Sequence, residues 1–369
     1  MMPKPVSNFF LCVMLLSLGS CSREPGLRPD APKPVGFSAE LEPRDHAETR
    51  AAGDMDLATL REKGFGVFAC YTGLHRYAES SVTSDFMHNQ EVTWDAGHEV
   101  WTYDPLKYWP NGEGEGGSSF ISGDHYVSFF AYAPYSDMDD SSPSTRPEGY
   151  CISTCTNPLE VGDPWILYRI HPDPYKQVDL LYAAPLLDRV KTGSEDCLPF
   201  HFRHALSNVG EEISVSCSES LRERLDEGVG TLYDDCQLVL TGVSLHGSLT
   251  EKARLDLWNR GTANWQPILS ENRLVETGEM EVFSGEHVLY TSSTAASTPW
   301  TGTGRGLFYI PLETDGYPQT ATVSVHCLIR HTVAGEVTQT ERNGDVLLYL
   351  KEFSQEGKTL TINIYLQNL

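Results

Sequence analysis

The feature that most constrains the fold is a series of short runs in which apolar residues alternate with smaller or polar ones. Clusters of Gly, Pro, Asp and Ser separate these runs. An alternation with a period of two is typical of a β-strand with one buried face. The runs lie at residues 35–41, 65–73, 91–95, 99–104, 126–134, 178–183, 199–206, 212–217, 236–247, 286–292, 306–312, 321–332, 345–353 and 359–369. Helical periodicity is confined to 57–64 and 219–228, so the sequence predicts an all-β fold built from sandwiches.

The length of the chain sets the expected number of domains. At roughly 150 residues per domain, a chain of 369 residues with 40% hydrophobic residues has material for two cores. The charged segment 219–228 marks the expected boundary. We therefore expect an N-terminal β-sandwich over 35–222 and a C-terminal β-sandwich over 223–369, which follow a signal peptide (1–20) and a tether (21–34).

The first residues of the chain have the pattern of an export signal. Lys4 precedes an apolar run at 9–18, and "LGSC" places small residues directly before Cys21. This resembles the lipobox of bacterial lipoproteins, in which the cysteine is lipidated and becomes the new N-terminus. A plain secretory signal with a chance cysteine is the alternative. The apolar run is too short to span a bilayer of about 30 Å, and the four prolines of 21–34 favour an extended tether to the outer membrane.

Charge excludes one class of partner. The chain has 51 acidic and 27 basic residues and a formal charge of -24. Such a surface repels phosphate backbones and anionic lipids, so we expect no nucleic-acid partner.

No pattern of residues points to catalysis, a metal or a cofactor. His201 and His204 are three apart, which on a regular strand places them on opposite faces. The acidic run 137–140 lacks the frame of an EF-hand, and 302–306 lacks the Lys and Ser/Thr of a phosphate-binding loop. We therefore expect a protein that is not an enzyme.

The cysteines after the lipobox leave several options. They are Cys70, Cys151, Cys155, Cys197, Cys217, Cys236 and Cys327. In an exported protein Cys151 could pair with Cys155, or Cys197 with Cys217. The three-residue spacing of "CISTC" and the lack of a second matching pair argue against zinc.

Four tryptophans in the first half allow a second function. If Trp94, Trp101, Trp109 and Trp165 were exposed, they could stack on sugar rings, as in a glycan-binding surface lipoprotein. If they are buried, they fill the core of a sandwich.

The order of the segments carries a resemblance that no single segment does. After the lipobox come "VGFSAEL" (35–41), "TRA" (49–51), "FGVFACY" (65–71), "VWTYDPLKYWP" (100–110), "VSFFAYAPY" (127–135), "DLLYA" (179–183), "PFHFRHALSNV" (199–209) and "GKTLTINIYLQNL" (357–369). This series covers nearly the whole chain and resembles the fimbrillin family of Bacteroidales, the Mfa-like and FimA-like subunits of type V pili. The resemblance implies two tandem transthyretin-like β-sandwich domains, export as a lipoprotein and assembly into a pilus that contributes to adhesion.

The resemblance also implies processing by an arginine-specific protease. That protease removes the lipidated segment together with the first strand. In this sequence the cut would fall between Arg50 and Ala51, with Arg44 as the second choice. If Arg50 is not cut, the chain could instead remain as a lipid-anchored subunit.

Strand exchange between pilin subunits is the assembly step that the resemblance implies. The removable strand would fill a groove with Val35, Phe37, Ala39 and Leu41. Its removal would expose a sheet edge that a strand of another subunit can complete. The last strand is a candidate donor or latch through Leu360, Ile362, Ile364 and Leu366, or a routine closing strand of its own domain. The polar inserts at 110–119 and 136–164 favour a minor, accessory or tip subunit.

Overall fold

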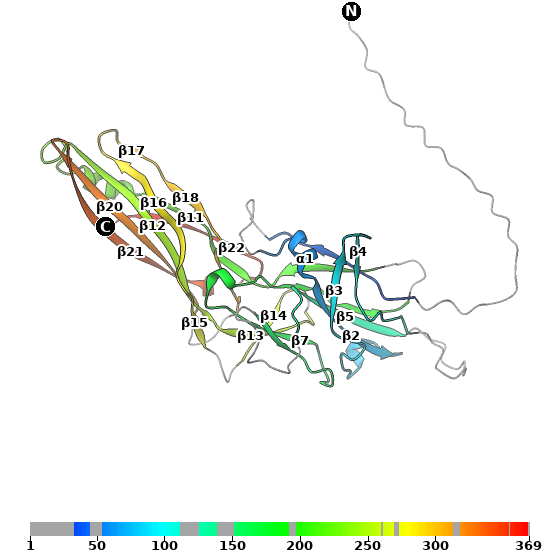
Figure 1. Cartoon of the computed structure of the whole chain (residues 1–369). Helices are drawn as coiled ribbons and strands as arrows, with labels where there is room; N and C mark the ends of the chain where they lie inside the picture. Colours follow the sequence, from blue (N-terminus) through cyan, green and yellow to red (C-terminus); the bar gives the residue numbers. More distant parts are fainter. Residues whose placement is uncertain are drawn as a thin grey trace, which may run out of the picture.

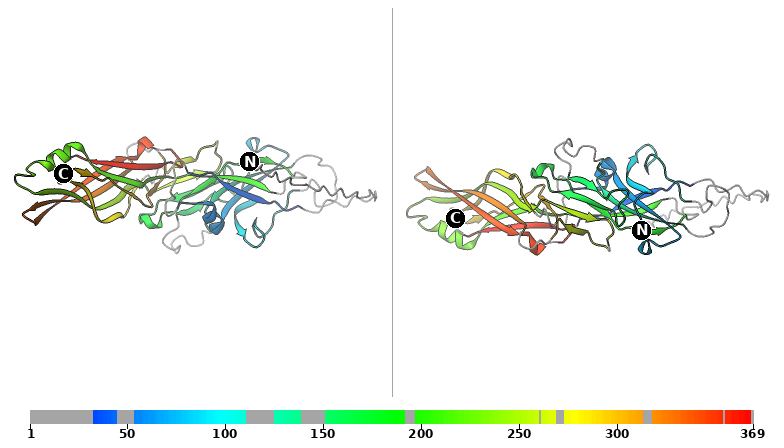
Figure 2. Two further views of the ribbon diagram at one scale, coloured as in Figure 1. Left: turned by 90° about the horizontal axis from the view of Figure 1, so that it is seen from above. Right: turned by 90° about the horizontal axis from the view of Figure 1, so that it is seen from below.

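The computed structural model describes residues 33–44, 54–110, 125–138, 151–191, 197–259, 261–268, 273–312, 318–353 and 355–367. In these residues strands predominate over short helices, which confirms the predicted all-β sandwich fold. The described part is elongated, with two groups of strands placed end to end (Figures 1 and 2).

In chain order the strands and helices are β1 (Phe37–Leu41), α1 (Leu57–Lys63), β2 (Phe65–Gly73), β3 (Met87–Asp95), β4 (Val100–Thr102), β5 (Tyr126–Ala133), β6 (Ile152–Cys155), β7 (Trp165–Arg169), β8 (Leu181–Ala183), β9 (Leu186–Arg189), β10 (Leu198–His204), β11 (Ser207–Cys217), α2 (Glu219–Asp226), β12 (Asp235–Thr250), β13 (Lys252–Asp256), β14 (Asn264–Pro267), β15 (Leu274–Glu276), β16 (Met280–Thr291), β17 (Ala296–Ser297), β18 (Trp300–Thr303), β19 (Leu307–Tyr309), β20 (Thr320–Val333), β21 (Glu336–Tyr349) and β22 (Thr359–Leu366).

The sheet that carries β1 is buried on both of its faces. Its strand order is β1-β10-β8-β5-β2-β3-β4, with β9 attached to β5. Along β2, Phe65 and Val67 point into one apolar cluster, while Phe68 and Cys70 point into another. A strand buried on two sides needs apolar residues at every position, which explains the continuous run "FGVFAC".

The second sheet of this half has the order β14-β13-β7-β6. It packs on the first through one shared apolar cluster, in which Tyr168 and Trp265 of this sheet lie with Phe68 and Tyr132 of the first. The other half of the molecule places the sheet β17-β16-β12-β20-β21, with β15 on β12, against the sheet β18-β11-β19, with β22 on β11. The core between those two sheets is built from apolar residues of the long strands, among them Leu238, Leu240 and Val325.

The sheets do not follow the boundary expected between residues 222 and 223. Helix α2 lies at that boundary, but β13, which comes after it, pairs with β7 of the first half, and β14 pairs with β13. The long strand β12 explains the crossing, because its 16 residues extend about 50 Å at roughly 3.3 Å per residue. The chain thus runs back along the molecule before it returns through β15 and β16 (Figure 1).

This crossing can be tested with Leu255→Ala. Leu255 is fully buried on β13 and lies opposite Ile166 of β7. We expect the substitution to lower the free energy of unfolding by about 2–5 kcal/mol, because it leaves a cavity. Hydrogen exchange should accelerate in β7. Gln266→Ala on the exposed side of β14 is the control and should change little. Faster exchange in β20 with β7 unchanged would contradict the arrangement.

Candidate functional site

Strand β1 ends the first sheet, and together with the residues just before it has hydrogen-bond partners on both sides. It pairs in parallel with β10, from Phe37 opposite Leu198 to Leu41 opposite Phe202. On its other side the Val35 amide donates to the Lys107 carbonyl at 2.9 Å, and the Trp109 amide donates to the Lys33 carbonyl at 3.1 Å. The first strand is therefore inserted into a groove between β10 and the segment after β4.

Phe37 anchors β1 in this groove. Its side chain is 2% exposed, and its ring lies 5.5 Å from the rings of Phe200 and Tyr103 and 5.9 Å from that of Phe129. Val35 is buried beside it. The two later residues predicted for the same face, Ala39 and Leu41, are partly buried against the same cluster.

A buried ion pair holds the chain just beyond β1. Arg44 is 6% exposed, and its Nη2 lies 2.8 Å from Oδ1 of Asp179, which is fully buried. Nη1 of Arg44 donates to the Leu206 carbonyl at 3.0 Å. The guanidinium lies over the ring of Phe308, 5.4 Å from its centroid. Arg44 thus joins the end of β1 to residues of both halves of the molecule.

The carboxylate of Asp179 has several hydrogen-bonding neighbours in addition to Arg44. Its Oδ2 lies 2.6 Å from Nδ1 of His204 and 3.2 Å from the Met55 amide, and its Oδ1 accepts from the Leu180 amide at 2.9 Å. Burial by itself would raise the pKa of Asp179, but Arg44 and His204 outweigh it and hold that pKa at about 2. The folded pKa is below the unfolded value of about 3.9. The stabilisation is therefore present above about pH 4 and is lost as the pH falls toward 2.

The same network joins the residues on either side of the segment that carries the predicted cut. Arg44 precedes residues 45–53 and Asp54 follows them, and Arg44 Nε lies 3.6 Å from Asp54 Oδ1. Arg50 and Ala51 lie outside the described residues, as does Cys21. A protease must take the arginine side chain into its own pocket, so a cut after Arg44 would require this buried side chain to leave Asp179.

The candidate donor or latch strand is part of its own sandwich in this structure. Strand β22 pairs in parallel with β11 from Thr359 to Leu366. Ile362, Ile364 and Leu366 are buried and Leu360 is partly buried. A cavity of about 310 Å³ beside β22 is lined by apolar side chains of β21 and β22, including Val346 and Leu348.

The tryptophans do not form an open platform. Trp109 is 8% exposed, and Trp101 packs edge to face on Phe65 with ring centroids 4.9 Å apart. The Trp94 ring is covered by the guanidinium of Arg61 at 4.4 Å. Trp165 lies in the other sheet of this half, and Arg254 is placed over its ring at 5.2 Å. Each ring therefore has a packing partner within the molecule.

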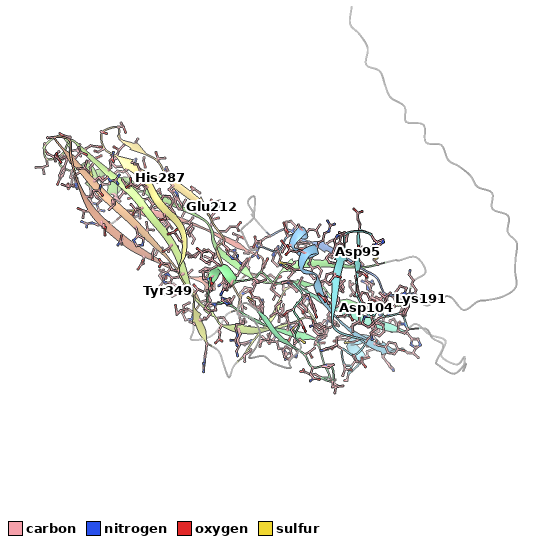
Figure 3. The ribbon with its side chains drawn as sticks, in the orientation of Figure 1. Asp95, Asp104, Lys191, Glu212, His287 and Tyr349 are labelled. Atoms are coloured by element: carbon pink, nitrogen blue, oxygen red, sulfur yellow. The ribbon has the colours of Figure 1, made fainter. Side chains whose placement is uncertain are left out.

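The histidines of "HFRH" point to opposite faces of β10, as predicted. His201 is exposed, with Nδ1 3.1 Å from Glu40 Oε2, whereas His204 is buried against Asp179. The polar side chains labelled in Figure 3 are spread along both halves. Among the described residues, no group of three His, Cys, Asp or Glu side chains is placed to hold a metal ion.

The structure also bears on the cysteines and on membrane crossing. Cys151 directly precedes β6 and Cys155 ends it, so the two are about 13 Å apart at roughly 3.3 Å per residue, which is too far for a disulfide. Cys217 is a buried thiol. Within the described ranges, the helices are all too short or too polar to cross a bilayer.

The comparison with solved structures identifies the fold. A fimbrial protein from Bacteroides vulgatus matches with a TM-score of 0.58 at 19% identity, over 91% of this chain and 96% of that one. A candidate cell adhesion protein from Bacteroides uniformis has a TM-score of 0.35 at 13% identity, over 85% of this chain and 97% of that one. The second score is too low to support an argument.

The chain thus has the fold of a Bacteroides fimbrial protein. The fold shared with that fimbrial protein agrees with the fimbrillin resemblance of the sequence. No protein-family model matches the sequence, and no curated protein matches it.

The stability of the buried pair can be tested with Arg44→Met. We expect the free energy of unfolding at pH 7 to fall by about 3–5 kcal/mol, because the variant leaves Asp179 charged and buried without its cation. The difference in the free energy of unfolding between the variant and the unmodified protein should become smaller from pH 7 to pH 5. Without Arg44 the pKa of Asp179 is raised by burial, and a group with a raised folded pKa favours folding at low pH.

Arg203→Met is the matched control for this measurement. Arg203 lies on β10, the strand that pairs with β1, and forms an ion pair with Glu42 at 3.0 Å. Unlike that of Arg44, its side chain is 39% exposed. The control should cost no more than about 1 kcal/mol. Equal losses in the two variants would mean that the Arg44–Asp179 pair does not stabilise the fold.

Proposed function

We propose that this chain is a structural, non-catalytic subunit of a type V pilus that assembles by strand exchange after an arginine-specific protease removes its first strand. The observation that supports this most directly is the position of β1. It is the terminal strand of a sheet, it fills an apolar groove, and the candidate cut at Arg50 follows it by nine residues. The fold shared with a fimbrial protein supports the same function.

Removal of β1 would create a strong acceptor for another strand. The edge of β10 would lose its partner from Leu198 to Phe202. The pocket around Phe37 would open to water, with apolar surface of Phe129 and Phe200 exposed. Unpaired strand edges of this kind bind extended segments through ladder hydrogen bonds and pockets for alternate side chains.

Before cleavage, the free energy of binding favours a precursor whose groove is filled by its own strand β1. Burial of each large apolar side chain contributes roughly 1.5–3 kcal/mol, and Val35 and Phe37 are both buried. While the chain between Arg44 and Asp54 is intact, the first strand is held at high effective concentration and outcompetes donors from other subunits. A cut in that segment removes this advantage, so proteolysis would control the timing of assembly.

The proposed location follows from the sequence signals. We propose lipidation at Cys21, transfer to the outer membrane, and release of the mature body into a pilus at the cell surface, where it contributes to adhesion. The polar inserts at 110–119 and 136–164 support an accessory or tip position over a stalk position. We do not propose the glycan-binding alternative, because Trp94, Trp101 and Trp109 are packed within the molecule.

Proteolysis of the purified precursor tests this function. Treatment with an arginine-specific protease should give one cut after Arg50, followed by loss of the first strand and formation of oligomers or capture of a donor peptide. Mass spectrometry and size-exclusion chromatography measure these two steps. Arg50→Ala should leave β1 attached to the body, because the other arginine between β1 and α1, Arg44, is buried.

Arg61→Ala is the control for the protease experiment. Arg61 is exposed on α1, and its substitution should leave the cut at Arg50 unchanged. A cleaved protein that stays monomeric and captures no donor would refute strand exchange at this groove.

A further inference from the structure

The groove of β1 has a charged end as well as an apolar one. The apolar end receives Phe37 and Val35, and the charged end receives the guanidinium of Arg44. Asp179, fully buried, and His204, 6% exposed, form the wall of the charged end. Asp54 adds a second carboxylate, 3.6 Å from Arg44 Nε. The fixed positive charge seated in this site belongs to the segment that the proposed cleavage removes.

Cleavage at Arg50 would separate Arg44 from Asp179. Arg44 would leave with β1, whereas Asp54, Asp179 and His204 would stay with the mature subunit. A buried carboxylate that loses its cation is strongly destabilised. A strand that refills the apolar pocket without a cation would therefore leave this cost in place.

From this geometry we propose that the emptied groove selects a strand of a different pilin subunit that carries Arg or Lys in the place of Arg44. This inference rests on the proposed function and specifies its partner. In β1 the basic residue follows Phe37 by seven positions. The expected donor thus has apolar residues at alternate positions and a basic residue seven positions after its largest buried side chain.

The chain's own last strand does not meet this requirement. When Ile362 takes the position of Phe37 in the same direction, the position of Arg44 falls on Leu369. When Leu360 takes the position of Phe37, it falls on Gln367. Neither residue is basic, so the groove disfavours β22 of a second copy. Strand β22 also fills its own sandwich beside β11.

Synthetic peptides can test the charge requirement on the cleaved full-length precursor. The first peptide copies residues 33–44 with an amidated end, and the second replaces Arg44 by citrulline, which keeps the shape and removes the charge. We expect the citrulline peptide to bind at least about tenfold more weakly, which corresponds to about 1.4 kcal/mol. Fluorescence anisotropy with inhibited protease measures both affinities. In the Asp179→Asn subunit the difference should disappear.

A peptide that carries Phe37→Ala separates this inference from the proposed function. It should bind weakly whatever the charge at position 44. If it binds as well as the unmodified peptide, the apolar groove was not opened and the proposed function fails. If only the citrulline peptide binds as well as the unmodified one, strand exchange stands and the cation requirement is wrong.

A gain of binding provides an independent check that does not depend on the folding of any subunit variant. A peptide of residues 358–369 should bind the cleaved subunit weakly, and the same peptide with Leu369→Arg should bind at least about tenfold more tightly, or about 1.4 kcal/mol. Equal affinities of the two peptides would overturn the proposal.

Discussion

The interaction on which the architecture depends is the insertion of β1 beside β10. Parallel pairing along β10 and the Phe37 ring together close one edge of the first sheet and fill its apolar cluster. The Arg44–Asp179 pair then fixes the chain at the point where the two halves meet, since Arg44 also contacts Leu206 and Phe308. One short N-terminal segment thus completes a core and a domain junction at once.

These two contacts have different physical consequences. Apolar burial tolerates strands of different sequence, because any strand with suitable alternate side chains can fill the pocket of Phe37. A buried carboxylate is selective, because it strongly disfavours a partner that lacks a positive charge. A groove that combines the two can bind strands tightly and still discriminate among them. In the proposed strand exchange, affinity and specificity would therefore come from opposite ends of the same segment.

Much of the fold could be predicted from the sequence, and the failures have one cause. The long runs that became β2, β5, β12 and β20 are strongly patterned: β2 and β5 are continuously apolar because both of their faces are buried, and buried and less buried residues alternate along much of β12 and β20. The short strands β13 and β14 were missed, since they are only partly apolar and join the sheet through the pairing of β13 with β7, far away in the chain. The boundary expected between residues 222 and 223 separates β13 from its partner β7 for the same reason. Local composition does not indicate which strands pair.

By itself the sequence determined the all-β class, the alternation of Val35 and Phe37 and the opposite faces of His201 and His204, since these depend on local periodicity. Only the tertiary structure decided that Arg44 is buried and that Asp179 is its partner. The two residues are separated by 135 positions, and in the sequence both are ordinary polar residues beside strands. Burial and ion pairing over such distances arise when sheets pack, and a linear pattern does not contain that information.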